Sequence, residues 1–285
     1  MSVKLIAVDM DSTFLKTDKS YNKPRFLKQY AELKQQGIHF VVASGNPLYT
    51  LQQYFPEIGH EIAFVAENGS HVMHQQEEIN FSRFDPILLQ QIISDLHADF
   101  ADCMVLCAKD RGYIGAELAE SSLSKLNIYF KKLQRVAQLS DVQADVCKLT
   151  LNTTPSTEPQ ALKLLATKSY VQQKQVDLVS SGFGFIDLIL PNQHKAFGLS
   201  FLQQLWQVED HEMLTIGDNY NDMAMVKQAG YGFAMANAVP ELKQIARYQT
   251  GSNDQEGVLD VIDWVLSNEK SWESWQQDHL TMASI

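Results

Sequence analysis

The sequence predicts an α/β protein, with a Rossmann-like parallel sheet covered by helices and an inserted α+β unit. Short, continuously apolar runs alternate with helical segments near the start of the chain, which is typical of a parallel sheet covered on both faces. The same alternation returns after the middle of the chain, where the intervening segment instead shows hairpins. We therefore predict a core domain of residues 1–83 and 191–285, with an inserted domain of residues 84–190.

The first part of the chain has the pattern strand, helix, strand, helix, strand. The expected segments are 4–10, 22–37, 38–45, 46–55 and 61–69. Because the strands of a parallel sheet point the same way, their carboxyl ends meet at one edge, where ligands collect in such folds.

The inserted domain is expected to pack helices against antiparallel strands. Its helices are predicted at 85–100, 123–136 and 155–169, and its strands at 100–108, 112–118, 146–153 and in a hairpin over 176–190. The returning core adds helices at 194–207, 221–230, 239–247 and 254–268, with strands at 212–219 and 231–237. The tail, 271–285, carries two tryptophans without a pattern, and both a frayed end and a docked strap stay open.

Composition excludes several classes of protein. Twenty-three basic against 34 acidic side chains give a net charge of −11, which argues against binding nucleic acid or an anionic membrane. No apolar run approaches the ~18 residues of a membrane span, and the first residues lack a secretory pattern. Three cysteines without framework spacing suit a reducing compartment, so we expect a cytoplasmic protein. The oligomeric state is not set by the sequence.

Four sequence-distant pieces fall at the same predicted sheet edge. They are Asp9 with Asp11, Ser44 with Gly45, Lys195, and the run from Asp218 to Asp222. Taken singly, each has an ordinary explanation: a strand-end aspartate or serine often caps the next helix, and a lone lysine is usually solvated. Together they supply what phosphoryl transfer requires, namely a nucleophile, compensating charge and a proton donor for the leaving oxygen.

The motifs VDMDSTFL, VVASGN, HKAFGL and IGDNYNDMAMVKQAG, in this order, carry a family resemblance. The sequence resembles the haloacid dehalogenase superfamily of aspartate-nucleophile phosphatases over nearly its whole length. It is most similar to the Cof-type branch, which has a large inserted cap of the C2 type. Within that branch it resembles bacterial sugar phosphatases of the SupH type.

The resemblance implies roles for the acidic residues. Asp9 would be the nucleophile that forms an aspartyl-phosphate, and Asp11 would protonate the leaving oxygen and then activate water. Mg²⁺ would be held by Asp9, the backbone carbonyl of Asp11 and Asp218, which are oxygen ligands suited to a hard cation. Asp222 would act behind these ligands, by orienting a metal-bound water or Lys195.

The resemblance also implies the substrate contacts. Ser44, Gly45, Lys195 and Asn221 would hold the phosphoryl oxygens, and Asn46 stands where many relatives carry an arginine. A further departure is Ser12, at a position where the family usually has glycine. Asp187, just before the return to the core, is a candidate for contact with the substrate.

We therefore expect a Mg²⁺-dependent phosphatase of small phosphorylated metabolites, most of all sugar phosphates. One alternative is a phosphotransferase or phosphomutase on the same framework, which passes the phosphoryl group to a sugar instead of water. Others are a signalling receiver domain, which would be much shorter, and a non-catalytic sugar-phosphate sensor.

Overall fold

The structure is a computed structural model that describes residues 3–267 and Trp275. Its chain forms two compact units, one from residues 1–44 and 199–285 and the other from residues 45–198. The predicted α/β class is confirmed, whereas the domain boundaries at 84 and 190 stay a prediction.

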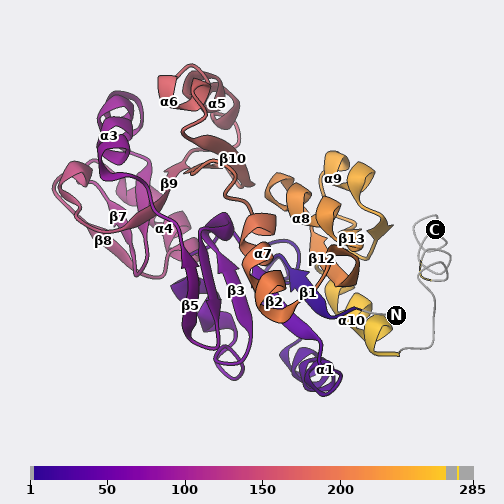
Figure 1. Cartoon of the computed structure of the whole chain (residues 1–285). Coiled ribbons are helices and arrows are strands. Elements are labelled where there is room, and N and C mark those ends of the chain that lie inside the picture. The colour runs from indigo at the N-terminus through magenta and orange to yellow at the C-terminus, as the bar shows by residue number, and fades with distance from the viewer. Residues whose placement is uncertain (1–2, 268–274, 276–285) are drawn as a thin grey trace. The chain divides into compact units, whose positions relative to one another are not determined.

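The first unit contains a fully parallel sheet in the strand order β14-β13-β12-β1-β2. Figure 1 labels β2, β1, β12 and β13 of this sheet. β1 lies at its centre, with Leu5 paired to Met213 on one side and to His39 on the other. The strands are β1 (Leu5–Val8), β2 (His39–Ala43), β12 (Met213–Gly217), β13 (Tyr231–Ala234) and β14 (Tyr248–Gln249). All four residues of β1 are buried, as expected for a strand covered on both faces.

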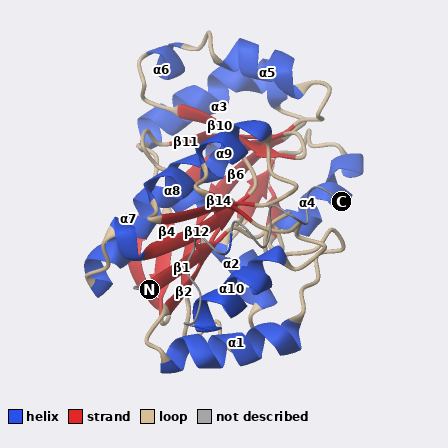
Figure 2. Ribbon diagram, turned by 90° about the vertical axis from the view of Figure 1, so that its right-hand side faces the viewer, coloured by secondary structure: helices blue, strands red, loops and turns tan. Residues whose placement is uncertain are grey.

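Helices flank this sheet, and α1 lies beside α10 (Figure 2). The helices are α1 (Lys23–Gln35), α8 (Met223–Gln228), α9 (Pro240–Ile245) and α10 (Gly257–Ser267), while α7 (Lys195–Trp206) spans both units. The Asn22 side chain caps α1 by accepting a hydrogen bond from the backbone N–H of Arg25. In the described part of the chain, no helix combines the length and the apolar character needed to cross a membrane.

Glu256 ties the start of α1 to the segment before α10. Its carboxylate accepts hydrogen bonds from Lys16 Nζ at 2.8 Å, Asn22 Nδ2 at 3.1 Å and Arg25 Nη1 at 3.0 Å. The bond from Lys16, with those from Asn22 and Arg25, holds the pKa of Glu256 at about 2.

We expect Glu256→Gln to cost stability at neutral pH. Because the pKa is lowered on folding from 4.5 to about 2, the carboxylate stabilises the fold above about pH 4.5, and this contribution disappears as the pH falls through about 2. After discounting for solvent screening, the loss should be about 1 to 2 kcal/mol. Urea unfolding at pH 7 and pH 3 measures it. A difference between variant and wild type that did not shrink at pH 3 would contradict the assignment.

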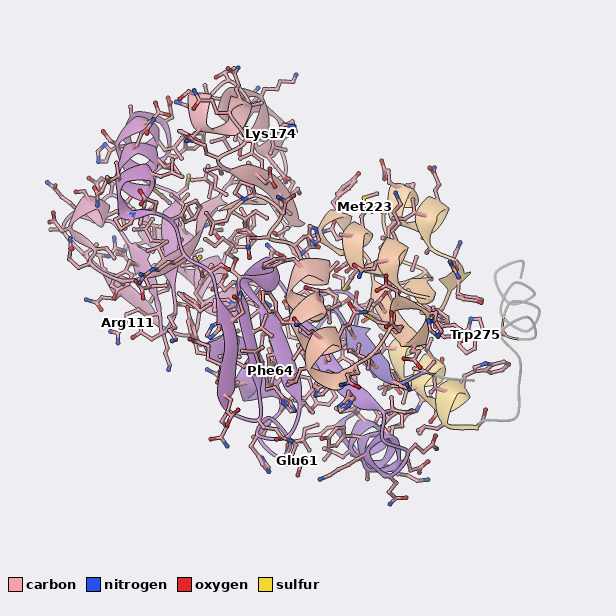
Figure 3. All side chains as sticks on the ribbon, viewed as in Figure 1. Glu61, Phe64, Arg111, Lys174, Met223 and Trp275 are labelled. Carbon is pink, nitrogen blue, oxygen red and sulfur yellow. The ribbon has the colours of Figure 1, made fainter. Side chains whose placement is uncertain are left out.

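Trp275 is buried against the first unit, although the rest of the predicted tail lies outside the described residues (Figure 3). Its indole N–H donates to the Gln249 carbonyl at 2.9 Å. Its ring meets those of Phe233 and Trp264 edge to face, at centroid distances of 5.8 and 5.1 Å. Of the two alternatives for the tail, a frayed end or a docked strap, Trp275 fits the docked strap.

The second unit holds two sets of strands. β3 (Ala63–Ala66), β4 (His71–His74) and β5 (Glu77–Phe81) form consecutive antiparallel pairs. A separate six-stranded sheet has the order β10-β11-β9-β6-β7-β8 and is antiparallel except between β7 and β8. Its strands are β6 (Met104–Ala108), β7 (Gly112–Ile114), β8 (Leu133–Arg135), β9 (Val146–Asn152), β10 (Asp177–Gly182) and β11 (Phe185–Ile189).

Several helices of this unit are shorter than predicted. They are α2 (Leu48–Leu51), α3 (Pro86–Phe100), α4 (Glu120–Tyr129), α5 (Glu158–Leu165) and α6 (Ser169–Gln172). The predicted helix 123–136 is wrong in its last part, since α4 ends at Tyr129 and β8 follows. Gly112 N donates to Lys132 O at 2.8 Å, and Val136 N donates to Ile114 O at 2.9 Å. Residues 132–136 thus form backbone hydrogen bonds with the edge of β7, which satisfies their polar groups. The local spacing of apolar residues cannot predict such long-range pairing.

Candidate active site

β1 ends at Val8, and Asp9 is the first residue after it. The Asp9 N–H still donates to Ile216 O of the neighbouring strand at 3.0 Å, and the side chain is 6% exposed. The carbonyl of Met10 then accepts hydrogen bonds from the N–H groups of Thr13 and Leu15, which closes a turn. Asp9 and Asp11 are therefore presented by a strand end and a turn, and not by two positions of one strand.

Ser12 adopts a left-handed conformation in this turn, with φ of 60°. Its carbonyl accepts a hydrogen bond from Asn237 Nδ2 at 2.8 Å, so the peptide orientation is fixed. The glycine expected from the resemblance would adopt this φ without the steric cost that a Cβ brings.

We expect Ser12→Gly to stabilise the protein by about 0.5 to 1 kcal/mol, because relief of the left-handed strain outweighs the greater freedom of glycine in the unfolded chain. Urea unfolding measures the change. Ser12→Ala is the matched control, since it removes the hydroxyl but keeps the strain. Equal effects of the two substitutions would assign the cost to the hydroxyl instead of the backbone.

A second acidic turn follows β12. Asp222 is fully buried, and its Oδ2 accepts hydrogen bonds from the backbone N–H groups of Asp218 at 2.9 Å and Asn219 at 3.0 Å. A Cβ at Gly217 would lie 2.5 Å from the Asp222 carboxyl carbon, so only glycine allows this close approach. The buried carboxylate of Asp222 thereby fixes the turn that presents Asp218.

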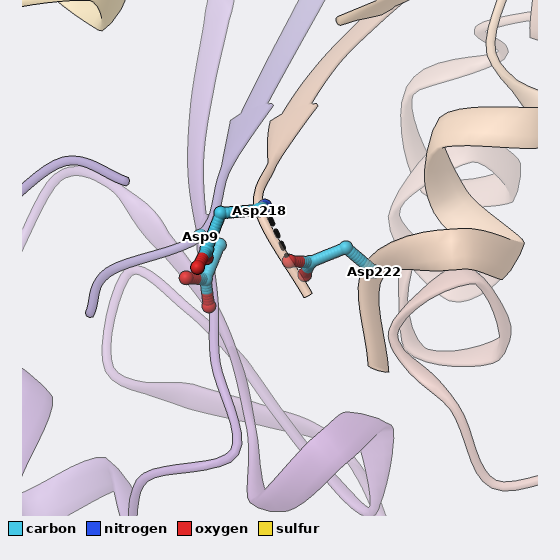
Figure 4. A group of neighbouring side chains, drawn as sticks. All are labelled: Asp9, Asp218 and Asp222. Carbon is cyan, nitrogen blue, oxygen red and sulfur yellow. Dashed lines mark hydrogen bonds between the residues drawn. The ribbon is translucent and has the colours of Figure 1, made fainter. Parts of the chain in front are cut away.

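Because β1 and β12 are parallel neighbours, their ends bring the two turns together. One carboxylate oxygen from each of Asp9, Asp218 and Asp222 lies within 4.8 Å of the others (Figure 4). Thr13 Oγ1 donates to Asp218 Oδ1 at 2.9 Å, which links the first turn to the second. Three carboxylates in mostly buried positions repel one another, and a hard divalent cation would offset that repulsion through oxygen ligands.

Asp11 is held differently from this group. Lys19 Nζ donates to Asp11 Oδ1 at 2.5 Å, and both side chains are partly buried. The sequence prediction did not include Lys19 or Thr13. Thr13 could have been found from its place beside the acid pair, whereas Lys19 lies in an irregular loop without any periodic signal.

The remaining predicted residues are distributed over both units. Ser44 is buried at the end of β2, next to β1, and Asn221 is half-buried beside Asp222 in a short 3₁₀ turn. Gly45 and Asn46 begin the second unit, where Lys195 is also found, fully buried as the first residue of α7.

Asp187 lies within the second unit and is 1% exposed. Its Oδ1 accepts a hydrogen bond from Thr150 Oγ1 at 2.6 Å, and its Oδ2 accepts from Asn68 Nδ2 at 2.8 Å and Ser181 Oγ at 2.6 Å. Both carboxylate oxygens are thus engaged by the protein. Contact between Asp187 and a substrate stays a prediction.

Comparison with known proteins agrees with this arrangement. The sequence profile of the haloacid dehalogenase-like hydrolases matches residues 6–262. The chain is 41% identical over 269 residues to 5-amino-6-(5-phospho-D-ribitylamino)uracil phosphatase YbjI of Escherichia coli, covering 94% of this chain and 98% of that protein. It is 27% identical to a phosphoglycolate phosphatase of Methanothermobacter thermautotrophicus, covering 91% and 97% of the two chains.

A solved structure extends the likeness to three dimensions. SMU.1108c from Streptococcus mutans superposes with a TM-score of 0.88 at 34% identity, over 93% of this chain and 100% of that one. The predicted family and enzyme class are confirmed. This chain belongs to the haloacid dehalogenase-like hydrolases, in their Cof-type branch, and is a phosphoric monoester hydrolase.

Proposed function

We propose that the protein is a Mg²⁺-dependent phosphatase that hydrolyses small phosphorylated metabolites, sugar phosphates in particular, through an aspartyl-phosphate on Asp9. The observation that supports this most is the meeting of Asp9, Asp218 and Asp222 at the ends of two neighbouring parallel strands. That acidic group suits phosphoryl transfer, in which a nucleophile works beside groups that balance the charge of the phosphate.

In the first half of the reaction, a carboxylate oxygen of Asp9 would attack phosphorus, and the bond from phosphorus to the substrate oxygen would break. Asp11 would give its proton to that leaving oxygen. In the second half, Asp11 would take a proton from water as the water attacks the aspartyl-phosphate. The bond to Asp9 then breaks, which frees inorganic phosphate and regenerates the carboxylate.

Other residues would hold the transferred group. We propose that Ser44, Gly45 and Asn221 donate hydrogen bonds to the phosphoryl oxygens and that Asn46 lies at the substrate. Buried Lys195 would contribute positive charge, and burial would strengthen that contribution.

The residues present fit a divalent cation. Asp9, Asp218 and the carbonyl of Asp11 would hold Mg²⁺, while Asp222 would keep Asp218 in place through the turn it already fixes. When bound, Mg²⁺ would offset the negative charge of the carboxylates and the phosphate.

Sugar phosphates are favoured by the relatives. The Escherichia coli relative is named for a compound with a phosphorylated ribityl chain, which is a sugar-derived polyol. We propose that this chain likewise acts on phosphate monoesters of sugars or polyols. We also propose a cytoplasmic location, supported by three cysteines that are all free thiols.

A panel of hexose, pentose and polyol phosphates, with phosphoglycolate and 5-amino-6-(5-phospho-D-ribitylamino)uracil, tests this function by release of inorganic phosphate. We expect turnover of several sugar phosphates, complete loss with EDTA and recovery with Mg²⁺. Asp218→Ala should raise the Mg²⁺ concentration needed for half-maximal rate by at least about tenfold. Full activity of the metal-free protein would contradict the metal assignment, and transfer of phosphate to a sugar in place of water would favour the phosphotransferase alternative.

A further inference from the structure

A buried lysine on β9 lies between two buried carboxylates in the second unit. Lys148 Nζ is 2.8 Å from Glu67 Oε2 and 3.4 Å from Asp187 Oδ2, and all three side chains are at most 3% exposed. The lysine stands inside the otherwise apolar run VCKLTL, where its charge is the only sequence signal that it has a special environment. A buried ammonium is costly unless it is paired, and here the two buried carboxylates supply the pairing.

The same ammonium also holds the backbone of the segment that follows Ser44. Lys148 Nζ donates a hydrogen bond to the Gly45 carbonyl at 2.6 Å. The next carbonyl, that of Asn46, accepts a hydrogen bond from the backbone N–H of Glu67 at 3.1 Å. Two successive carbonyls of this segment are therefore fixed by a lysine and by its own ion-pair partner.

The hydrogen bond from Lys148 to the Gly45 carbonyl also fixes the orientation of the Gly45–Asn46 peptide. In a trans peptide the carbonyl and the following N–H point in opposite directions, so the bond to Gly45 O directs the Asn46 N–H away from the cluster. Asn68 confines the segment further, because its Oδ1 lies 3.0 Å from where a Cβ at position 45 would be. Asn68 is itself held by Asp187 at 2.8 Å.

The electrostatics keep the lysine charged. Burial alone lowers the pKa of Lys148, but Asp187 and Glu67 outweigh it and hold the pKa well above its ordinary value. Burial raises the pKa of Glu67, and the nearby ammonium opposes that rise. The donor to Gly45 is thus a charged group, which makes a shorter and stronger hydrogen bond than a neutral donor would.

We propose that Lys148 is a positioning residue for the phosphate-binding segment 44–46, with Glu67 and Asp187 holding the lysine in place. The inference rests on the proposed phosphatase function, because it is in that reaction that segment 44–46 would receive the phosphoryl group. Lys148 would not touch substrate; it would act by fixing the Gly45–Asn46 peptide.

The test compares Lys148→Met/Asp187→Asn with Asp187→Asn alone. Lys148→Met by itself would leave Asp187 buried without a counter-charge and could simply unfold the protein. In the double variant that carboxylate is gone, and Glu67 can take up a proton because burial already raises its pKa. Asp187→Asn then keeps the hydrogen bond from Lys148 to Gly45, and the double variant lacks it. Neither protein has a buried charge without a counter-charge.

Two measurements are made on each protein. The first is amide hydrogen exchange of the peptide that covers residues 45–51, without substrate. We expect exchange in the double variant to be at least about tenfold faster than in Asp187→Asn. The second is inhibition by inorganic phosphate together with kcat and KM. A misplaced binding segment should weaken phosphate inhibition and lower kcat/KM by about 10- to 100-fold.

Lys125→Met is the matched control. Lys125 also donates to a backbone carbonyl in the second unit, that of Thr153 at 3.0 Å, and its removal should leave both measurements on segment 44–46 unchanged. A purely structural role for Lys148 would lower the folded fraction and hence the apparent kcat, with KM and phosphate inhibition constant.

Three outcomes would overturn the inference. They are unchanged exchange in the double variant, faster exchange with unchanged phosphate inhibition, and an equal effect of Lys125→Met. If the wild-type protein neither bound phosphate nor released it from any metabolite, the proposed function would fail, while the exchange measurement would still decide whether Lys148 holds the segment.

Discussion

Replacing Asp9 with asparagine is expected to lower kcat by at least about 10³-fold and to leave no phosphate on the protein. The amide has nearly the volume of the carboxylate but is a poor nucleophile, so the covalent step cannot proceed. Rapid acid quenching of a turnover mixture, followed by intact mass measurement, detects the aspartyl-phosphate in the wild type and its absence in the variant.

The control for this prediction is that the Asp9→Asn variant keeps the wild-type fold. Its backbone N–H bonds to Ile216 O, and that contact is independent of the side chain, so the variant should keep the wild-type circular dichroism spectrum. A folded Asp9→Asn protein that still accumulated covalent phosphate would require another nucleophile. Retained turnover without any covalent intermediate would instead indicate direct attack by water.

Asp11→Asn is expected to separate substrates by their leaving groups. Loss of a general acid should slow hydrolysis of sugar phosphates by about 10²- to 10⁴-fold, because an alkoxide leaves poorly without a proton. An aryl phosphate such as p-nitrophenyl phosphate needs little protonation and should lose much less. Steady-state kcat values for both substrate types are measured on one protein preparation. The ratio of the loss on sugar phosphates to the loss on aryl phosphates tests whether Asp11 is the general acid.

Lys19→Met provides a related variant, since Lys19 donates to Asp11 Oδ1 at 2.5 Å. If Lys19 only holds Asp11, its loss should produce a smaller effect with the same preference for aryl phosphates. Equal losses on sugar and aryl phosphates in Asp11→Asn would remove the general-acid assignment, and Asp11 would then be a residue of the binding turn.

The acidic group could be predicted because its residues follow apolar runs. Asp9 and Asp218 each come directly after a buried strand, and the ends of neighbouring parallel strands must meet at one sheet edge. Lys19 could not be found in this way, since an irregular loop carries no period. The left-handed φ of Ser12 could not be predicted from the residue type, because a serine, unlike a glycine, does not indicate that conformation.

Contacts over long sequence distances explain the other differences. Local spacing suggested that the helix continued past Tyr129, but the pairing of β8 with β7 decided the conformation there. The ion pairs of Lys148 could not be predicted from the sequence either, because Glu67 lies on a distant turn and Asp187 on another strand. A single sequence indicates that such a lysine is unusual but not which groups compensate it.

The central position of β1 in its sheet has a consequence for folding during synthesis on the ribosome. Leu5 pairs with His39 soon after synthesis begins, yet its other neighbour, Met213, emerges only when most of the chain has been made. The second unit, residues 45–198, is complete before that moment and can fold while β1 still has one open edge. Asp9 is therefore synthesised long before Asp218, and the acidic group of Asp9, Asp218 and Asp222 can form only after Asp222 has been made. During that interval the open edge of β1 exposes unpaired backbone N–H and C=O groups, with which another strand can pair.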